Sequence, residues 1–183
     1  MKKLSAWLTA IIMALGLGLL APGAASATPS YCGLVWSSLG KSNQAMSGAS
    51  VTNIRSGQHA CFDRLVIDIK GKAAGYNVRY VSKVVQDGSG LPIKLRGGAF
   101  LQLTVHSPSY DSATGKATFT PANRSEVTNV STYQTFRQVA WAGSFEGHTA
   151  LGLGVRARLP FKVFTLAGPG TGSTLVVDVA HHW

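Results

Sequence analysis

VTNIRSGQHACFDRLVIDIKG, residues 51–71, is the stretch that decides the fold. From Leu65 to Ile69 every second residue is a large aliphatic one, and the residues between them include Asp68. This period of two is typical of a half-buried β-strand, whose side chains point alternately to its two faces. The pattern predicts the first clear strand of the chain at this point.

Similar short β-type runs recur through the rest of the sequence. Gly, Pro, Asp or Ser separates most of them, and no window after the N-terminus keeps the apolar spacing and caps of a helix. The pattern therefore predicts an all-β domain, a sandwich or a barrel. The expected runs are Tyr76–Val85, Pro92–Leu95, Phe100–His106, Phe136–Trp141, Thr149–Val155, Phe161–Leu166 and Thr174–Ala180.

The N-terminus predicts export. Two lysines precede an apolar run from Leu4 to Leu20, and small residues follow up to Ala27. This is the order of a secretory signal peptide, expected over residues 1–27. The alternative is a membrane anchor, for which the run has only the minimum length. We expect a secreted protein, extracellular or attached to the cell wall, with no transmembrane anchor in the mature chain.

Removing 27 of the 183 residues leaves 156, enough for one domain. Residues 28–60 are rich in Ser, Gly, Ala and Asn and predict an irregular N-terminal arm before a domain over 61–183. Both cysteines, Cys32 and Cys61, lie in the exported part. An even cysteine count in an oxidising compartment favours a disulfide, which would hold the arm against the domain.

The charge of the mature chain favours anionic partners. Two of the seventeen basic residues fall in the signal peptide, so fifteen basic residues face seven acidic ones, a net charge of +8. The basic residues are scattered without a run of three, which argues against nucleic acid as a partner. Anionic cell-wall polymers or lipid head groups fit the same charge.

The glycine-rich stretch AGPGTGST, residues 167–174, resembles a phosphate-binding loop only superficially. A P-loop carries a lysine before its Ser/Thr and leads into a helix. Here Gly172 is followed directly by Ser173, and the alternating residues after it predict a strand. The stretch is interpreted as a turn between two strands that binds no nucleotide.

No motif of an enzyme or a metal site is found. There is no G-x-S-x-G and no H-E-x-x-H sequence, and the five histidines lack ligand spacing. Glu146, in SFEGH, has no second acid near it in the sequence, so a paired-carboxylate hydrolase is not supported. We expect no catalytic residues, no metal and no cofactor.

Aromatic and basic residues alternate in three segments, GYNVRYV, FRQVAWAG and VRARLPFKVF. Aromatic rings stack on sugar rings, and arginine pairs with anionic groups. The alternative is that the rings belong to the core and the cations are simply solvated. The residues predicted to bind a ligand are Tyr76, Arg79, Tyr80, Arg137, Trp141, Arg156 and Arg158.

Taken in order, the segments CFDRLVIDIKG, GYNVRYV, DGSG, LQLTV, SFEGHTALGLGVRARLPFKVFTL and LVVDVAH resemble the AMIN-like domain of secreted actinobacterial proteins, a relative of the AMIN domain. The resemblance runs from about Cys32 to His181. It implies a β-sandwich of two packed sheets without enzyme chemistry, and a role at the cell envelope. AMIN domains accompany cell-wall amidases and secretin-type pores and are thought to target peptidoglycan.

The chain departs from this family in two features. Many relatives are lipoproteins, whereas Cys32 has no lipobox before it. The family commonly carries Pro-Pro-Arg before the strand corresponding to LVVDV, whereas GPGTGST is longer and lacks the Arg. A ligand contact made by that Arg in relatives is therefore not expected here.

Three functions follow as hypotheses. The first is a non-catalytic secreted module that binds a cell-wall polymer. This polymer is either the glycan of peptidoglycan or an anionic polymer associated with it. The second is an interaction protein that modulates another secreted enzyme or protein. The third is a small hydrolase. A flat aromatic and basic sheet face favours the first, an exposed apolar patch rimmed with charge the second, and titratable groups clustered in a deep pocket the third.

Overall fold

The computed structural model describes residues 31–73, 75–168 and 170–183. The expected signal peptide, residues 1–27, lies outside the described residues. A single 3-10 turn, η1 (Tyr31–Gly33), precedes the strands. The strands are β1 (Lys41–Asn43), β2 (Ser50–Gln58), β3 (Phe62–Lys70), β4 (Tyr76–Val81), β5 (Val84–Val85), β6 (Pro92–Ile93), β7 (Ala99–Val105), β8 (Phe136–Phe145), β9 (His148–Val155), β10 (Phe161–Ala167) and β11 (Ser173–Ala180).

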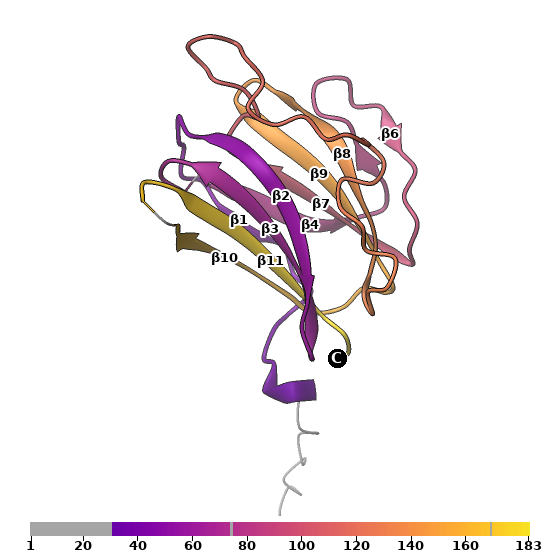
Figure 1. The fold of residues 1–183 in the computed structure, drawn as a ribbon. Helices are drawn as coiled ribbons and strands as arrows, with labels where there is room; N and C mark the ends of the chain where they lie inside the picture. The colour runs from indigo at the N-terminus through magenta and orange to yellow at the C-terminus, as the bar shows by residue number, and fades with distance from the viewer. Residues whose placement is uncertain (1–30, 74, 169) are drawn as a thin grey trace, which may run out of the picture.

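Two antiparallel sheets pack face to face and confirm the predicted β-sandwich (Figure 1). One sheet has five strands in the order β1-β4-β7-β9-β8, and the other has four in the order β10-β11-β3-β2. In the described residues no helix is long and apolar enough to cross a membrane.

The alternation of residues in each strand builds the core between the sheets. On β3 the side chains of Leu65, Ile67 and Ile69 face inward and are at most 2% exposed. They meet inward residues of the opposite sheet, such as Leu103 and Leu153, which are fully buried. Burying side chains of this size contributes about 1.5–3 kcal/mol each.

The segment around β5 and β6 forms a small third layer on the outside of the five-stranded sheet. Its Val84 packs on this face, beside Leu95. The β9 residues beneath are Gly152 and Gly154, because a Cβ at Gly152 would lie 2.8 Å from Leu95 and one at Gly154 would collide with the carbonyl oxygen of Arg96. The GLG sequence of β9 is therefore explained by close packing.

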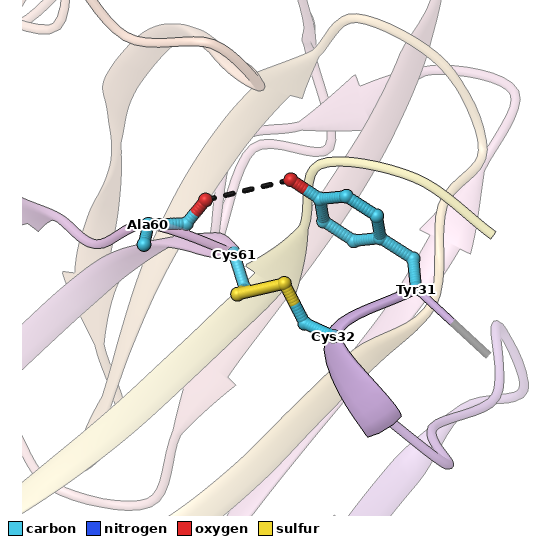
Figure 2. Close-up of a disulfide and its surroundings, with 4 residues drawn as sticks. All are labelled: Tyr31, Cys32, Ala60 and Cys61. Atoms are coloured by element: carbon cyan, nitrogen blue, oxygen red, sulfur yellow. Dashed lines mark hydrogen bonds between the residues drawn. A yellow bond between two sulfur atoms is a disulfide. The ribbon is translucent and has the colours of Figure 1, made fainter. Parts of the chain in front are cut away.

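The disulfide between Cys32 and Cys61 is confirmed (Figure 2). It ties η1 to the residue before β3, and beside it the hydroxyl of Tyr31 donates a hydrogen bond to the carbonyl oxygen of Ala60 at 3.4 Å. The arm also carries β1, which pairs with β4 through Lys41 to Asn43.

The prediction of an irregular arm over residues 28–60 is wrong for its last part. Ser50–Gln58 form β2, a strand of nine residues of which eight pair with β3. A β-bulge between Val51 and Asn53 shifts the register, so the inward residues Val51 and Ile54 are three positions apart instead of two. Because the bulge interrupts the period of two, the sequence pattern does not predict this strand.

The glycine-rich stretch joins two strands, as predicted. It lies between Ala167 at the end of β10 and Ser173 at the start of β11. The N–H of Gly168 donates to the carbonyl oxygen of Gly172 at 2.8 Å, and the Ser173 hydroxyl donates to Gly71. This serine therefore closes the turn against the end of β3.

Candidate functional site

The outer face of the four-stranded sheet carries a set of aromatic and basic side chains. The residues of β3, β10 and β11 that alternate with the core residues point to this face. The register places Lys162, Asp178 and Arg64 side by side across three strands. The next row brings Phe164 beside Val176 and Val66. Residues about 100 positions apart in the sequence thus become neighbours.

We name this surface the basic–aromatic strip, formed by Trp36, Phe62, Arg64, Lys162 and Phe164. The guanidinium of Arg64 lies 5.2 Å from the ring centre of Phe62 and 5.6 Å from that of Phe164. The ammonium of Lys162 lies 4.7 Å from the ring centre of Phe164. At the other end the rings of Trp36 and Phe62 are 5.5 Å apart. Cations and rings therefore alternate along the strip at cation–π distances.

A carboxylate beneath the strip fixes its central arginine. Arg64 donates two hydrogen bonds to Asp178, at 2.7 and 2.8 Å, and the Asp178 side chain is only 3% exposed. The hydrogen bonds from Arg64 to Asp178 raise the pKa of the guanidinium. This fork geometry fixes the guanidinium of Arg64 near both phenylalanine rings. The charge of Arg64 is largely balanced by Asp178.

Lys162 differs from Arg64 because it is exposed and has no carboxylate within 4.0 Å among the described residues. Its charge is available to a ligand, while the half-buried rings of Phe62 and Phe164 offer apolar faces. Such a surface can stack sugar rings and attract anions. Its geometry therefore suits the binding of an extended polymer.

The three aromatic residues predicted to bind a ligand do not lie on this strip. Trp141 is 7% exposed in the core. Tyr76 and Tyr80 share the inward face of β4 and pack against the core. The Tyr80 hydroxyl donates to the carbonyl oxygen of Leu159 and accepts its N–H, both at 2.9 Å, and burial raises the pKa of this phenol.

Most of the arginines predicted to bind a ligand donate hydrogen bonds to backbone carbonyl oxygens instead. Arg137 binds the carbonyl oxygens of three nearby residues, and Arg156 binds that of His181. Arg158 binds Ser38 in the arm and lies 4.9 Å from the ring centre of Tyr80. Arg79 is exposed on the outer side of β4.

The structure thus brings together Tyr80 and Arg158, and it does not gather the seven predicted residues on one surface. Sequence reasoning missed the whole strip. The signal that could have found it is the alternation in FDRLVIDI and FKVFTLA, where Phe62, Arg64 and Phe164 fall on the face opposite the core residues.

One histidine–carboxylate pair is present in the core. The Nε2 atom of His181 lies 3.1 Å from Oδ1 of Asp63, and the two side chains are 2% and 0% exposed. The second oxygen of Asp63 accepts the backbone N–H groups of Thr135 and Phe136. No substrate can reach this pair, so its role is to join β3, β8 and the C-terminal segment.

Two adjoining hollows lie beside β8, with volumes of about 340 and 290 Å³. They share Arg124, Trp141 and Ser144. The Ser144 hydroxyl donates to the carbonyl oxygen of His148, and no histidine lines either hollow. Asp87 also lines the first hollow, but the hydrogen bonds of the Ser144 hydroxyl go to His148, Thr149 and the N–H of Ser109, and none joins it to Asp87. Among the described residues, no three metal-ligating side chains are grouped.

Comparison with known proteins gives one match. Residues 49–181 match the AMIN-like domain. No curated protein and no solved structure matches the chain. The match covers most of the chain, includes four of the five strip residues and begins inside the predicted arm, next to β2.

Proposed function

The chain belongs to the AMIN-like domain family, and from that premise we propose that it is a secreted, non-catalytic module that binds anionic polymers of the cell wall through its basic–aromatic strip. Domains of this family are associated with the cell envelope and are generally binding modules. The observation that carries the proposal is the alternation of Phe62 and Arg64 of β3 with Phe164 and Lys162 of β10.

The distribution of charge supports an anionic ligand. Three of the seven acidic side chains, Asp68, Asp178 and Glu126, are paired with arginines, and Asp63 is fully buried. Most of the fifteen basic side chains of residues 28–183 have no such partner among the described residues. The field around the molecule is therefore positive and draws anionic polymers toward it.

The spacing of the strip supports a polymer with both rings and charges. A sugar ring stacks on the faces of Phe62 or Phe164, while a phosphate or carboxylate meets the ammonium of Lys162. Secretion, inferred from residues 1–27, places the protein where such polymers occur. Peptidoglycan with its attached anionic polymers is the ligand class that combines both groups.

The experiment is co-sedimentation of residues 28–183 with purified cell walls at increasing salt. The Debye length falls from about 10 Å at 0.1 M to about 3 Å at 1 M, so the ionic part of binding should weaken while stacking remains. Lys162→Ala should remove mainly the salt-sensitive part, and Phe164→Ala the remainder. Each should weaken retention roughly two- to fivefold, the usual range of one exposed cation–π contact.

Matched controls separate the strip from general charge and apolar area. Lys116→Ala removes an exposed lysine from a distant loop, and Phe145→Ala removes a ring that is 50% exposed at the end of β8. Both should bind walls as the unmodified protein does. Equal losses in strip and control variants would assign binding to general charge and apolar area, and no retention at low salt would refute the proposal.

A further inference from the structure

The two sheets of the sandwich differ in width by one strand. Tyr76 and Tyr80 of β4 reach the carbonyl oxygens of Val163 and Leu159, so β4 lies over β10. Strand β1 continues the upper sheet beyond β4. The four-stranded sheet ends at β10, which is its outer edge in Figure 1. The four-stranded sheet therefore has an unoccupied strand position beside β10, beneath β1 of the other sheet.

The backbone of β10 can accept a further strand. In an antiparallel pair, alternate residues direct their N–H and C=O groups away from the partner. The N–H of Phe161 is one of these, because it donates to the carbonyl oxygen of Ser37 at 3.0 Å. By the same period, the N–H groups of Val163 and Thr165 face outward, and no backbone group among the described residues pairs with them.

The arm occupies only the first position of this edge. Ser37 forms a single bridge with Phe161, and the chain then turns away toward β1. The opposite end of the sandwich is closed, because Gln58 of β2 donates to Thr132 and the hydroxyls of Ser56 and Thr128 are 2.7 Å apart. An exposed edge is ordinarily blunted by charge, proline or a covering loop. Along residues 163–167 none of these is present among the described residues.

A groove runs beside the free edge. It has a volume of about 560 Å³ and is lined by Trp36, Phe161 and Val163, with Lys41 above. The ammonium of Lys41 lies 4.7 Å from the ring centre of Phe161, and burial lowers the pKa of this lysine. Val35, which also lines the groove, is 91% exposed.

We propose that an extended, acidic segment of a partner protein adds to β10 as the fifth strand of this sheet. Main-chain hydrogen bonds to Val163 and Thr165 supply affinity, and alternate side chains enter the groove. Both charged side chains lining the groove, Lys41 and Lys162, are basic. A second copy of the chain would bring like charges together, whereas carboxylates on the incoming strand meet both ammonium groups.

The test uses an end-capped eight-residue peptide that alternates valine and glutamate, labelled for fluorescence anisotropy. The variant is Thr165→Pro, which removes an outward N–H and leaves the ladder to β11 intact, since proline is tolerated at such edge positions. Thr165→Val is the matched control that keeps the N–H. We expect the peptide to bind the unmodified protein and Thr165→Val alike, and Thr165→Pro at least tenfold more weakly.

Two further measurements make the result decisive. Amide hydrogen exchange should show new protection of Val163 and Thr165 when the peptide is present, which a purely ionic contact would not produce. A peptide alternating valine and lysine should bind at least tenfold more weakly. Thermal unfolding of Thr165→Pro verifies its fold, and if it is unfolded the exchange result alone decides.

The proposal is overturned if the acidic peptide does not bind, if it binds Thr165→Pro equally, or if the two amides stay unprotected. Sedimentation velocity showing a dimer that Thr165→Pro dissolves would assign the edge to a second copy and overturn the acidic partner. Wall retention by Thr165→Pro should equal that of the unmodified protein, because the outward N–H of Thr165 is no part of the strip, although Trp36 and Lys162 belong to both the groove and the strip.

Discussion

Replacing Asp63 with alanine should remove a large share of the stability of the domain. Its Oδ2 accepts the N–H groups of Thr135 and Phe136 at 2.6 and 2.9 Å, and its Oδ1 lies 3.1 Å from His181. All of these groups are buried. A hydrogen bond to a charged group contributes about 1.5–3 kcal/mol, so the two backbone bonds together give about 3–6 kcal/mol. Domains of this size have a total stability of about 5–15 kcal/mol.

Urea unfolding followed by tryptophan fluorescence measures this loss. Asp63→Asn keeps an oxygen acceptor in place and should lose less than Asp63→Ala. Asp68→Ala is the control on the same strand, because Asp68 pairs on the outer face with Arg55, whose side chain is 57% exposed. Such surface pairs contribute about 0–1 kcal/mol. If Asp63→Ala and Asp68→Ala lose equal stability, the buried acceptor is not the anchor that we infer.

Three other perturbations have defined outcomes. Gly154→Ala should lower the free energy of unfolding by roughly 1–3 kcal/mol, because the new Cβ collides with the carbonyl oxygen of Arg96; an unchanged urea midpoint would contradict this packing. Burial, with a smaller effect of a neighbouring histidine, lowers the pKa of His106 below 6.5, so its folded form binds fewer protons than the unfolded chain. Stability should therefore fall as the pH drops below about 6.5 and fall less in His106→Gln, as urea titrations at pH 7 and 5 would show. Iodoacetamide should label Cys32 and Cys61 only after reduction, and reduction should cost about 3–4 kcal/mol of stability by urea titration; labelling without reductant would refute the disulfide.

The sequence predicted the strands that keep a strict alternation and missed the one that does not. Strands β3 and β11 are predictable from the segments LVIDI and LVVDV, because every inward residue of these segments is aliphatic. Strand β2 was assigned to the arm, because the bulge after Val51 breaks its period and its outward residues are polar. A strand whose inward and outward positions are shifted by a bulge does not keep the constant period of two that predicts a strand.

The candidate site was harder to predict than the fold, for a physical reason. Alternation states which residues share a face, such as Tyr76 and Tyr80 on the inward face of β4. It does not state which strands become neighbours. The strip depends on the pairing of β3 with β11 and of β11 with β10, which places Arg64 beside residues about 100 positions away. Register of this kind is decided by tertiary packing.

That pairing also determines when the chain can fold. Strand β3, residues 62–70, is paired by β11, residues 173–180, so the centre of one sheet joins two segments that lie about 100 residues apart in the sequence. The entropy of closing so long a loop must be lost before these contacts form, which slows folding of such topologies. A chain from which residues 173–180 have not yet emerged lacks the strand that completes this sheet. Until β11 pairs with β3, the apolar inward side chains of β3 remain open to chaperones.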